Sequence, residues 1–241
     1  MARLPRLVIP EHPHHLVQRG NNGQPIFLTD EDRREWLRLL GDAAGTHGTA
    51  VHAYALLGDH YRLLMTPKDA ESLSRTMQSL GRRYVSAFNR RHGRTGTLWE
   101  GRFRGGLIEA PRHFLACMRF IELCPATAGG AAQADDFPWS SAAHHLGHRR
   151  DPLITDHPLY WALGNTPFER QAAYKAFLEQ GVSQAEASEL EQAARQGWAL
   201  GSAQFLKALG EQTNRPLKPR PRGRPRRAAL PDASSTSSNT D

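Results

Sequence analysis

Two apolar runs separated by a short polar connection constrain the fold of this chain more than any other feature. Residues 50–57 and 61–66 consist mostly of aliphatic and aromatic side chains, and Gly58-Asp59-His60 lies between them. A connection of this length suits a β-hairpin. Pro67 closes the second run. The sequence therefore predicts two adjacent antiparallel strands.

Strand and helix patterns alternate along the chain on both sides of this hairpin. Helices are indicated by apolar residues at intervals of three and four, and strands by short apolar runs bounded by turn residues. In chain order the patterns predict a strand at 14–19, a helix at 31–47, the two hairpin strands, a helix at 70–91, a strand at 99–109 and a helix at 112–124. This order predicts an α+β fold, a ferredoxin-like antiparallel sheet with helices on one face.

The composition divides the chain into three parts. Residues 1–150 hold the predicted core domain, and residues 151–213 carry further helical patterns that predict a C-terminal helical appendage. Residues 214–241 are rich in Arg, Pro, Ser and Thr. Such a segment cannot bury a core, so we predict a disordered basic tail.

Positive charge is concentrated in two segments. The formal net charge is +7, yet residues 120–214 hold six basic and eleven acidic side chains. Residues 80–119 hold nine basic and two acidic side chains, and residues 215–227 hold seven basic and no acidic ones. This distribution is typical of a protein that touches a polyanion at two places, so we predict nucleic acid as the partner.

Neither a membrane span nor a secretory signal is predicted. The sequence has no run of about 18 apolar residues, and its start lacks the apolar segment of about 7–15 residues that a secretory signal needs. Cys117 and Cys124 are too far apart on one predicted helix to form a disulfide. Two cysteines also supply no zinc framework. We expect a cytoplasmic, nucleoid-associated protein.

Several blocks of sequence, in order, resemble one known family. The blocks are Gln18-Arg19-Gly20-Asn21-Asn22, His60 with its apolar strand, Gly81-Arg82-Arg83-Tyr84, Gly96-Thr97-Leu98-Trp99-Glu100-Gly101-Arg102 and Trp139-Ser140-Ser141. Together they resemble the REP-associated tyrosine transposases, relatives of the insertion sequence 200-like transposases of the HUH class, over roughly residues 1–165. The resemblance implies a ferredoxin-like domain that recognises a single-stranded DNA hairpin of a repetitive palindromic element, cuts beside it and serves DNA transposition and recombination.

The resemblance also implies a catalytic apparatus, and most of it is replaced here. The family holds a divalent metal, Mg²⁺ or Mn²⁺, with a His-hydrophobic-His pair, and a helix-borne Tyr attacks the phosphate while an Asn one turn further assists the metal. In this chain the four positions are His60, Arg62, Phe120 and Cys124. Arg cannot donate a lone pair to a cation, and Phe has no hydroxyl. We therefore expect a DNA-binding protein impaired in strand cleavage, with no metal unless the family chemistry survives.

Other interpretations remain open at this point. Tyr54, Tyr61 or Tyr84 could supply a displaced nucleophile in an active transposase and single-strand endonuclease, although a packing role suits Tyr84 better. A basic regulator that binds RNA or DNA, without a link to mobile elements, is a second alternative. His15 and His52 could complete a metal site with His60, but ordinary strand positions explain them equally well.

Arginines supply the predicted DNA contacts. The aromatic residues between them could stack on unpaired bases, but the periodicity favours core positions for Phe88 and Trp99. Arg62 could itself hold the phosphate that the metal once held. The predicted contacts are Arg19, Arg82, Arg83, Arg90, Arg91, Arg94, Arg102, Arg104, Arg222, Gly223 and Arg224. The last three, between prolines, resemble an AT-hook, which would add duplex contacts in a minor groove.

Overall fold

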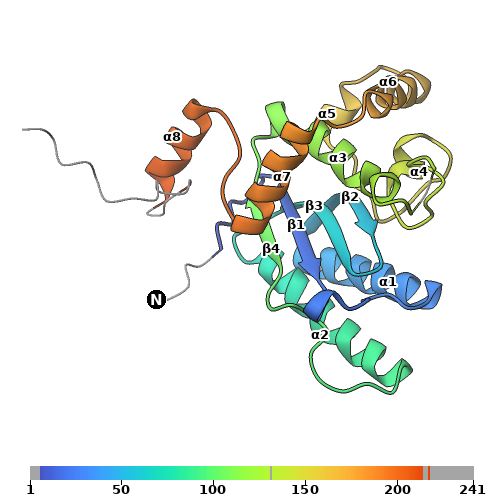
Figure 1. Ribbon diagram of the computed structural model, residues 1–241. Coiled ribbons are helices and arrows are strands. Elements are labelled where there is room, and N and C mark those ends of the chain that lie inside the picture. The colour runs from blue at the N-terminus through green and yellow to red at the C-terminus, as the bar shows by residue number, and fades with distance from the viewer. Residues whose placement is uncertain (1–5, 131, 214–216, 218–241) are drawn as a thin grey trace, which may run out of the picture.

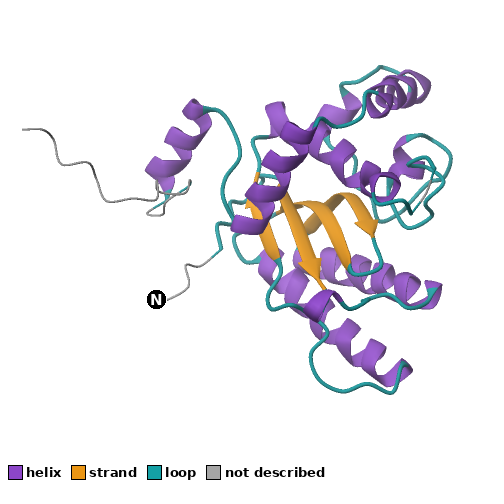
Figure 2. Cartoon of the chain, viewed as in Figure 1, coloured by secondary structure: helices purple, strands orange, loops and turns teal. Residues whose placement is uncertain are grey.

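A computed structural model describes residues 6–130, 132–213 and 217 of the chain. Its centre is a four-stranded antiparallel sheet in the order β2-β3-β1-β4 (Figure 2). The strands are β1 (His14–Arg19), β2 (Thr49–Leu56), β3 (His60–Pro67) and β4 (Arg104–Leu107). The predicted hairpin is formed by β2 and β3, and β1 lies between β3 and the short edge strand β4.

Helices lie on both faces of the sheet (Figure 1). One face is covered by α1 (Asp30–His47) and α2 (Ser72–Arg91), and the other by α3 (Ala110–Thr127) and α7 (Gln184–Gln196). The remaining helical elements are η1 (Asn21–Gly23), α4 (Ala142–His145), α5 (Pro158–Trp161), α6 (Pro167–Glu179) and α8 (Ala203–Gln212). Helix α6 packs on α3 and α5, whereas α8 lies beyond the β4 edge of the sheet (Figure 1).

The cover on both faces follows from the side chains of the central strands. In β3, Tyr61 and Leu63 pack into the core beneath α1 and α2, while Leu64 packs against α3. Alternate residues of a strand face opposite sides of the sheet, and nearly every position of β2 and β3 is buried. The predicted α+β class and antiparallel sheet are confirmed. Helices were expected on one face; the second layer forms because both sides of the hairpin are apolar.

A buried carboxylate fixes the start of α1 against the end of α2. The Thr29 side chain accepts a hydrogen bond from the Asp32 backbone, and the Asp32 side chain accepts from the Thr29 backbone, a reciprocal capping box. Asp32 is fully buried, and its carboxylate also binds Arg91 at 2.6 Å and His92 at 3.0 Å. Arg91, a predicted DNA contact, therefore has a structural partner.

Glycine at position 106 lets α7 approach the edge strand. A Cβ atom on Gly106 would lie 2.6 Å from the carbonyl oxygen of Ala193 and 2.7 Å from that of Trp198. Any other residue would force the helix away, because real Cβ contacts are longer. The close packing brings α7 onto β1 and β4.

Among the described residues, no helix is long and apolar enough to cross a lipid bilayer. Cys117 and Cys124 both lie on α3, and both are buried as free thiols.

Candidate nucleic-acid interface

The positions that the resemblance assigns to catalysis gather around one guanidinium group. His60 and Arg62 point to the same face of β3, since alternate residues of a strand share a side. Phe120 and Cys124 lie one turn apart on α3, which covers that face. The guanidinium carbon of Arg62 lies 4.9 Å from the centre of the Phe120 ring. The Cys124 thiol donates a 3.1 Å hydrogen bond to the carbonyl oxygen of Phe120.

A carboxylate from α7 neutralises Arg62. Glu191 forms an ion pair with the Arg62 guanidinium, and the two side chains are 26% and 7% exposed, respectively. Glu191 also binds the Nε atom of Arg195 at 2.5 Å. Burial opposes the ionisation of Glu191, but Arg62 and Arg195 outweigh it and hold the pKa of this carboxyl below its ordinary value. A phosphate at Arg62 would have to share the guanidinium with Glu191 or displace the Glu191 carboxylate.

Glu191 and Arg195 were not among the residues predicted from the sequence. The available signal was their spacing of four residues on a helix whose buried side is made by Leu190, Ala193 and Ala194. Such a spacing indicates a local ion pair. It does not indicate that the helix packs over β1 and β4, where the pair meets Arg62.

The side chains at the position that the resemblance assigns to a metal do not fit a divalent cation. The Nδ1 atom of His60 lies 2.6 Å from an Asp59 carboxylate oxygen, and burial lowers the pKa of His60 below its ordinary value. A neutral imidazole could serve as a ligand, but the neighbouring position holds the permanent positive charge of Arg62. Electrostatic repulsion from Arg62 therefore opposes a metal at His60.

The other two histidines that could complete a metal site lie apart from the His60 imidazole. The Cα atom of His15 lies opposite Leu64, four residues along the sheet from His60 and so roughly 13 Å from its Cα atom, and the His15 ring meets the Phe120 ring edge-on at 5.7 Å. The Nδ1 atom of His52 lies 2.6 Å from the carbonyl oxygen of Thr155, and its Nε2 atom lies 2.9 Å from the hydroxyl of Thr66. Neither histidine is placed to complete a site with His60.

A second group of metal-ligand side chains lies at the start of the C-terminal helices. Potential ligand atoms of His144, His145 and Asp156 lie within 4.8 Å of one another. The Nδ1 atom of His144 accepts a 3.0 Å hydrogen bond from the Asp151 backbone, so its Nε2 atom carries the proton and faces Asp156 at 3.3 Å. The Nδ1 atom of His145 lies 2.6 Å from the buried Glu122 carboxylate. Hydrogen bonds with one another and with Asp151 and Glu122 account for the positions of these three side chains.

The three tyrosines considered as displaced nucleophiles are buried. Tyr54 donates a 2.6 Å hydrogen bond to Asp151, and Tyr84 donates one of 2.6 Å to the carbonyl oxygen of Ile26. Tyr61 points to the opposite face of the sheet from His60. Burial raises the pKa of all three phenols above the ordinary value. None of these hydroxyls is placed to attack a phosphate near His60.

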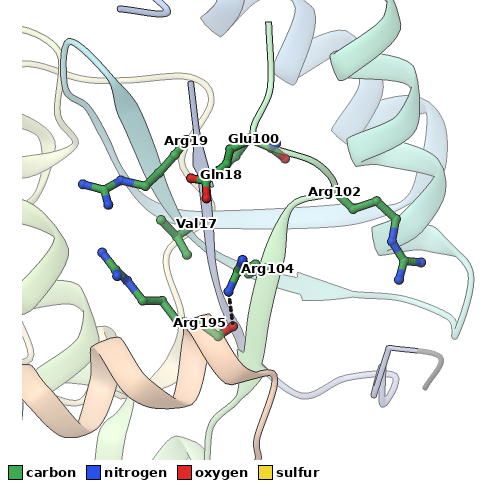
Figure 3. Close-up of a pocket in the computed structure, with 7 residues that line it drawn as sticks. All are labelled: Val17, Gln18, Arg19, Glu100, Arg102, Arg104 and Arg195. Carbon is green, nitrogen blue, oxygen red and sulfur yellow. Dashed lines mark hydrogen bonds between the residues drawn. The ribbon is translucent and has the colours of Figure 1, made fainter. Parts of the chain in front are cut away.

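Three arginines from separate elements meet beside this site. Arg19 ends β1, Arg104 begins β4 and Arg195 lies in the last turn of α7, and all three line a small cavity of about 90 Å³. The Arg104 guanidinium donates a 3.3 Å hydrogen bond to the carbonyl oxygen of Arg195 (Figure 3). Arg102 also lines the cavity, but its side chain extends away from the other three (Figure 3). Glu100 is the acidic member of the lining.

The predicted arginines of α2 separate into two groups. Arg83 forms an ion pair with Asp42 at 2.9 Å, and Arg91 is bound by Asp32, so both contact acidic residues of α1. Arg82 and Arg90 are exposed and form no ion pair within the described part of the chain. Arg94, in the loop that follows, donates to the Gln24 side chain at 3.0 Å.

The AT-hook-like residues Arg222, Gly223 and Arg224 lie outside the described residues.

Comparison with known proteins identifies the fold. No protein-family model matches the sequence, and no curated protein matches it. The structure of a REP-associated tyrosine transposase bound to a REP hairpin matches with a TM-score of 0.50 and 19% identity, covering 65% of this chain and 92% of that chain. The fold is that of a REP-associated tyrosine transposase. A candidate transposase from Deinococcus radiodurans R1 gives a TM-score of 0.36 and 21% identity, covering 48% of this chain and 91% of that one.

The match to the REP-associated tyrosine transposase confirms, at the level of the fold, the resemblance seen in the sequence blocks.

Proposed function

We propose that this chain is a DNA-binding member of the REP-associated tyrosine transposase family that holds hairpin or repetitive DNA and is impaired in strand cleavage. The observation that carries the proposal is the meeting of Arg19, Arg104 and Arg195 at one cavity. Guanidinium groups match phosphate oxygens in shape and charge. Asp59 pairs with Arg19 at 3.6 Å and Glu191 with Arg195 at 2.5 Å, which leaves Arg104 without an acidic partner among the described residues. Like charges repel, so the convergence of the three arginines favours a bound anion.

The arginine cavity continues into a wider positive surface. Gln18 and Arg102 line both the arginine cavity and a larger cavity on the α2 side, which Arg82 also lines. A strand of DNA could therefore pass from α7, over the β4 edge, to α2. We call the arginines along this path the basic band: Arg19, Arg82, Arg102, Arg104 and Arg195.

The impaired cleavage is supported by three features of the site beside the basic band. Phe120 offers no hydroxyl for a covalent phosphotyrosine link. Arg62 opposes a divalent cation, and its charge is already paired with Glu191. The tyrosines considered as substitutes are buried. The positions that cut DNA in the family would therefore only help to bind DNA in this chain.

The three parts of the chain contribute differently to the proposed binding. Residues 1–150 would form the main DNA-binding domain, and the extension at 151–213 adds Arg195 to the basic band. The tail at 214–241 would add charge through its AT-hook-like motif. Such a protein would associate with nucleoid DNA in the cytoplasm.

The proposal is tested by measuring DNA binding of single-arginine variants. The probe is a fluorescent DNA hairpin with a single-stranded tail, titrated at several salt concentrations. Arg104→Ala and Arg195→Ala should each weaken binding and flatten the slope of log affinity against log salt by about 0.9. Arg150→Ala is the matched control, because Arg150 is exposed near the opposite sheet edge, beside β2. Equal effects of all three changes would contradict the assignment of the basic band.

A further inference from the structure

A further polar cavity lies on the β2 side of the sheet, away from the basic band. It has a volume of about 280 Å³ and is formed by the segment 144–160 and the start of α6. This segment is joined to β2, because the Thr155 backbone donates a 2.8 Å hydrogen bond to the carbonyl oxygen of Val51. Strands β2 and β4 are opposite edges of the sheet, so the sheet separates this cavity from the arginine cavity (Figure 1).

Three arginines converge on this second edge. Arg149 and Arg150 lie in the loop after α4, and Arg170 lies near the start of α6. Arg149 donates to the carbonyl oxygen of Pro138 at 3.3 Å, and Arg170 donates to that of Gly164 at 3.2 Å. Within the described part of the chain, none of the three arginines forms an ion pair with a carboxylate. Their positive charges are therefore left without a counter-charge.

The charge of Arg170 is the hardest of the three to accommodate, because this side chain is buried. Arg170 is 8% exposed, and its guanidinium carbon lies 4.0 Å from the centre of the Trp161 ring. A ring face and one carbonyl oxygen attract the guanidinium group but do not neutralise it. Burial of a charge is costly unless an opposite charge is paired with it. An anion in the cavity would supply that partner.

The acidic residue of the lining, Asp156, is directed to histidines instead. Its carboxylate lies 3.3 Å from the Nε2 atom of His144 and 3.9 Å from that of His145. Three arginines therefore face one carboxylate in this lining, which leaves an excess of positive charge. Such an excess inside a concave site concentrates anions there.

The walls of the cavity are held in place by contacts within the protein. Gly147 has a φ of +77°, a conformation that favours glycine, and it turns the chain after α4 towards the loop that carries Arg149 and Arg150. The Tyr160 hydroxyl donates a 2.7 Å hydrogen bond to the carbonyl oxygen of His145, which joins α5 to α4. The arginines are thus placed before a ligand arrives, which lowers the cost of binding.

We propose that this cavity binds a small phosphate-type anion, either free phosphate or a phosphate monoester, at a site separate from the DNA. Guanidinium groups match phosphate oxygens in charge and geometry. The volume is slightly below the about 300–1,000 Å³ that is usual for pockets of drug-sized ligands, so a phosphate group with a small body fits best. The proposal is independent of the DNA-binding proposal, because this cavity and the arginine cavity share no lining residue.

The charge of the surrounding chain favours a small anion over a second stretch of DNA. Residues 120–214, which contain the whole lining, hold six basic and eleven acidic side chains. An extended polyanion would meet this acidic surface on its way to the cavity, and like charges repel. A small anion can reach the three arginines without covering the surface around them.

The test follows the fluorescence of Trp161 while inorganic phosphate is added to the full chain, with NaCl used to keep the ionic strength constant. Trp161 is 51% exposed and lies against Arg170, so an anion at Arg170 should change its emission in a saturable way. Trp161→Phe keeps an aromatic ring on Arg170 and removes this signal. The difference between the two proteins isolates the response of Trp161 from that of the other tryptophans.

Three arginine variants locate the bound phosphate. Arg150→Ala removes an exposed member of the lining, so the protein should fold and bind phosphate about tenfold more weakly or worse, the loss expected for one hydrogen bond between charged groups. Arg112→Ala is the matched control, because Arg112 is exposed on α3 and does not line the cavity. Arg104→Ala removes an arginine of the basic band. Both should keep the phosphate affinity of the unaltered protein.

The other outcomes would overturn the proposal. Without a saturable response of Trp161, or with equal phosphate affinity in Arg150→Ala, the anion site is wrong while DNA binding stands. If Arg104→Ala weakens phosphate binding and Arg150→Ala does not, the phosphate lies on the basic band. If Arg150→Ala also weakens binding of the hairpin, the cavity holds a phosphate of DNA and a separate anion site is wrong. Failure of the unaltered protein to bind a hairpin would overturn the proposed function alone.

Discussion

Arg62 of β3 and Glu191 of α7 form an ion pair across the interface between the sheet and its second helical layer. The two residues are 129 positions apart in the chain. Through Glu191, the pair also reaches Arg195 and so connects the α3 face of the sheet to the basic band. Glu191 compensates the buried charge of Arg62 in this conformation, and a phosphate would compete with Glu191 for the Arg62 guanidinium.

Removing the carboxylate of Glu191 should strengthen DNA binding and weaken the fold. In Glu191→Gln, Arg195 and Arg62 lose a negative neighbour, so hairpin affinity should rise about fivefold, the equivalent of about 1 kcal/mol of repulsion removed. The free energy of unfolding should fall, because Arg62 stays buried without its counter-charge. Glu189→Gln, at an exposed position on the same helix, is the control for the change in net charge. Unchanged affinity in Glu191→Gln would show that the pair does not compete with DNA.

Arg82 and Arg91 should behave differently although both lie on α2. Arg91→Ala removes a partner of the fully buried Asp32, so it should lower the free energy of unfolding by about 3 kcal/mol, the lower end for breaking a buried pair, since His92 remains. Arg82→Ala should leave stability within about 0.5 kcal/mol and weaken hairpin binding. Chemical denaturation measures the free energy of unfolding of both variants, and fluorescence anisotropy titration measures their affinity for the hairpin. A stable Arg91→Ala protein with weakened DNA binding would reverse the two assignments.

Stability should fall as the pH drops from about 6.5 to 5. Burial lowers the pKa of His14 to about 4, of His15 to about 3 and of His52 to about 4. In the unfolded chain these groups titrate near 6.5, so below that pH the unfolded state binds more protons than the folded state. Each histidine can then cost up to about 1.4 kcal/mol per pH unit. Urea denaturation at pH 7, 6 and 5 measures the free energy of unfolding. An equal free energy at the three pH values would contradict the prediction.

The tail should contribute through its charge alone. A chain that ends at Leu217 keeps the contact of this residue with Leu206 and Leu209 of α8 and removes six basic residues. Its folding should be unchanged, while the slope of log affinity against log salt should flatten by up to about 5, at about 0.9 per lost phosphate contact. An equal slope for the full chain and the chain that ends at Leu217 would show that the tail does not contact DNA.

The sequence predicted most of the elements because their periodicity is strong. The hairpin, the helix before it and the helix after it lie within a few residues of the predicted ranges. The strand predicted at 99–109 is shorter, because Trp99 makes only an isolated bridge with Gly20 and regular pairing with β1 begins at Arg104.

The candidate site was only partly predictable from the sequence. The sequence blocks around His60 and Phe120 placed both residues in one candidate site, and the structure brings them together around Arg62. Glu191 and Arg195 were missed, because a helical pattern does not tell which face of the sheet the helix covers. The division of the α2 arginines between acidic partners and solvent likewise depends on contacts with α1, which local sequence does not encode.

The central claim is that this protein binds hairpin DNA without cutting it, and one paired experiment tests it most directly. The full chain is incubated with a labelled single-stranded DNA hairpin and Mg²⁺ or Mn²⁺, and the same sample is run on a native gel and on a denaturing gel. We expect a retarded band on the native gel, with intact free DNA on the denaturing gel. A shortened strand, or a covalent protein–DNA adduct, would contradict the account and would mean that a residue other than Phe120 supplies the nucleophile.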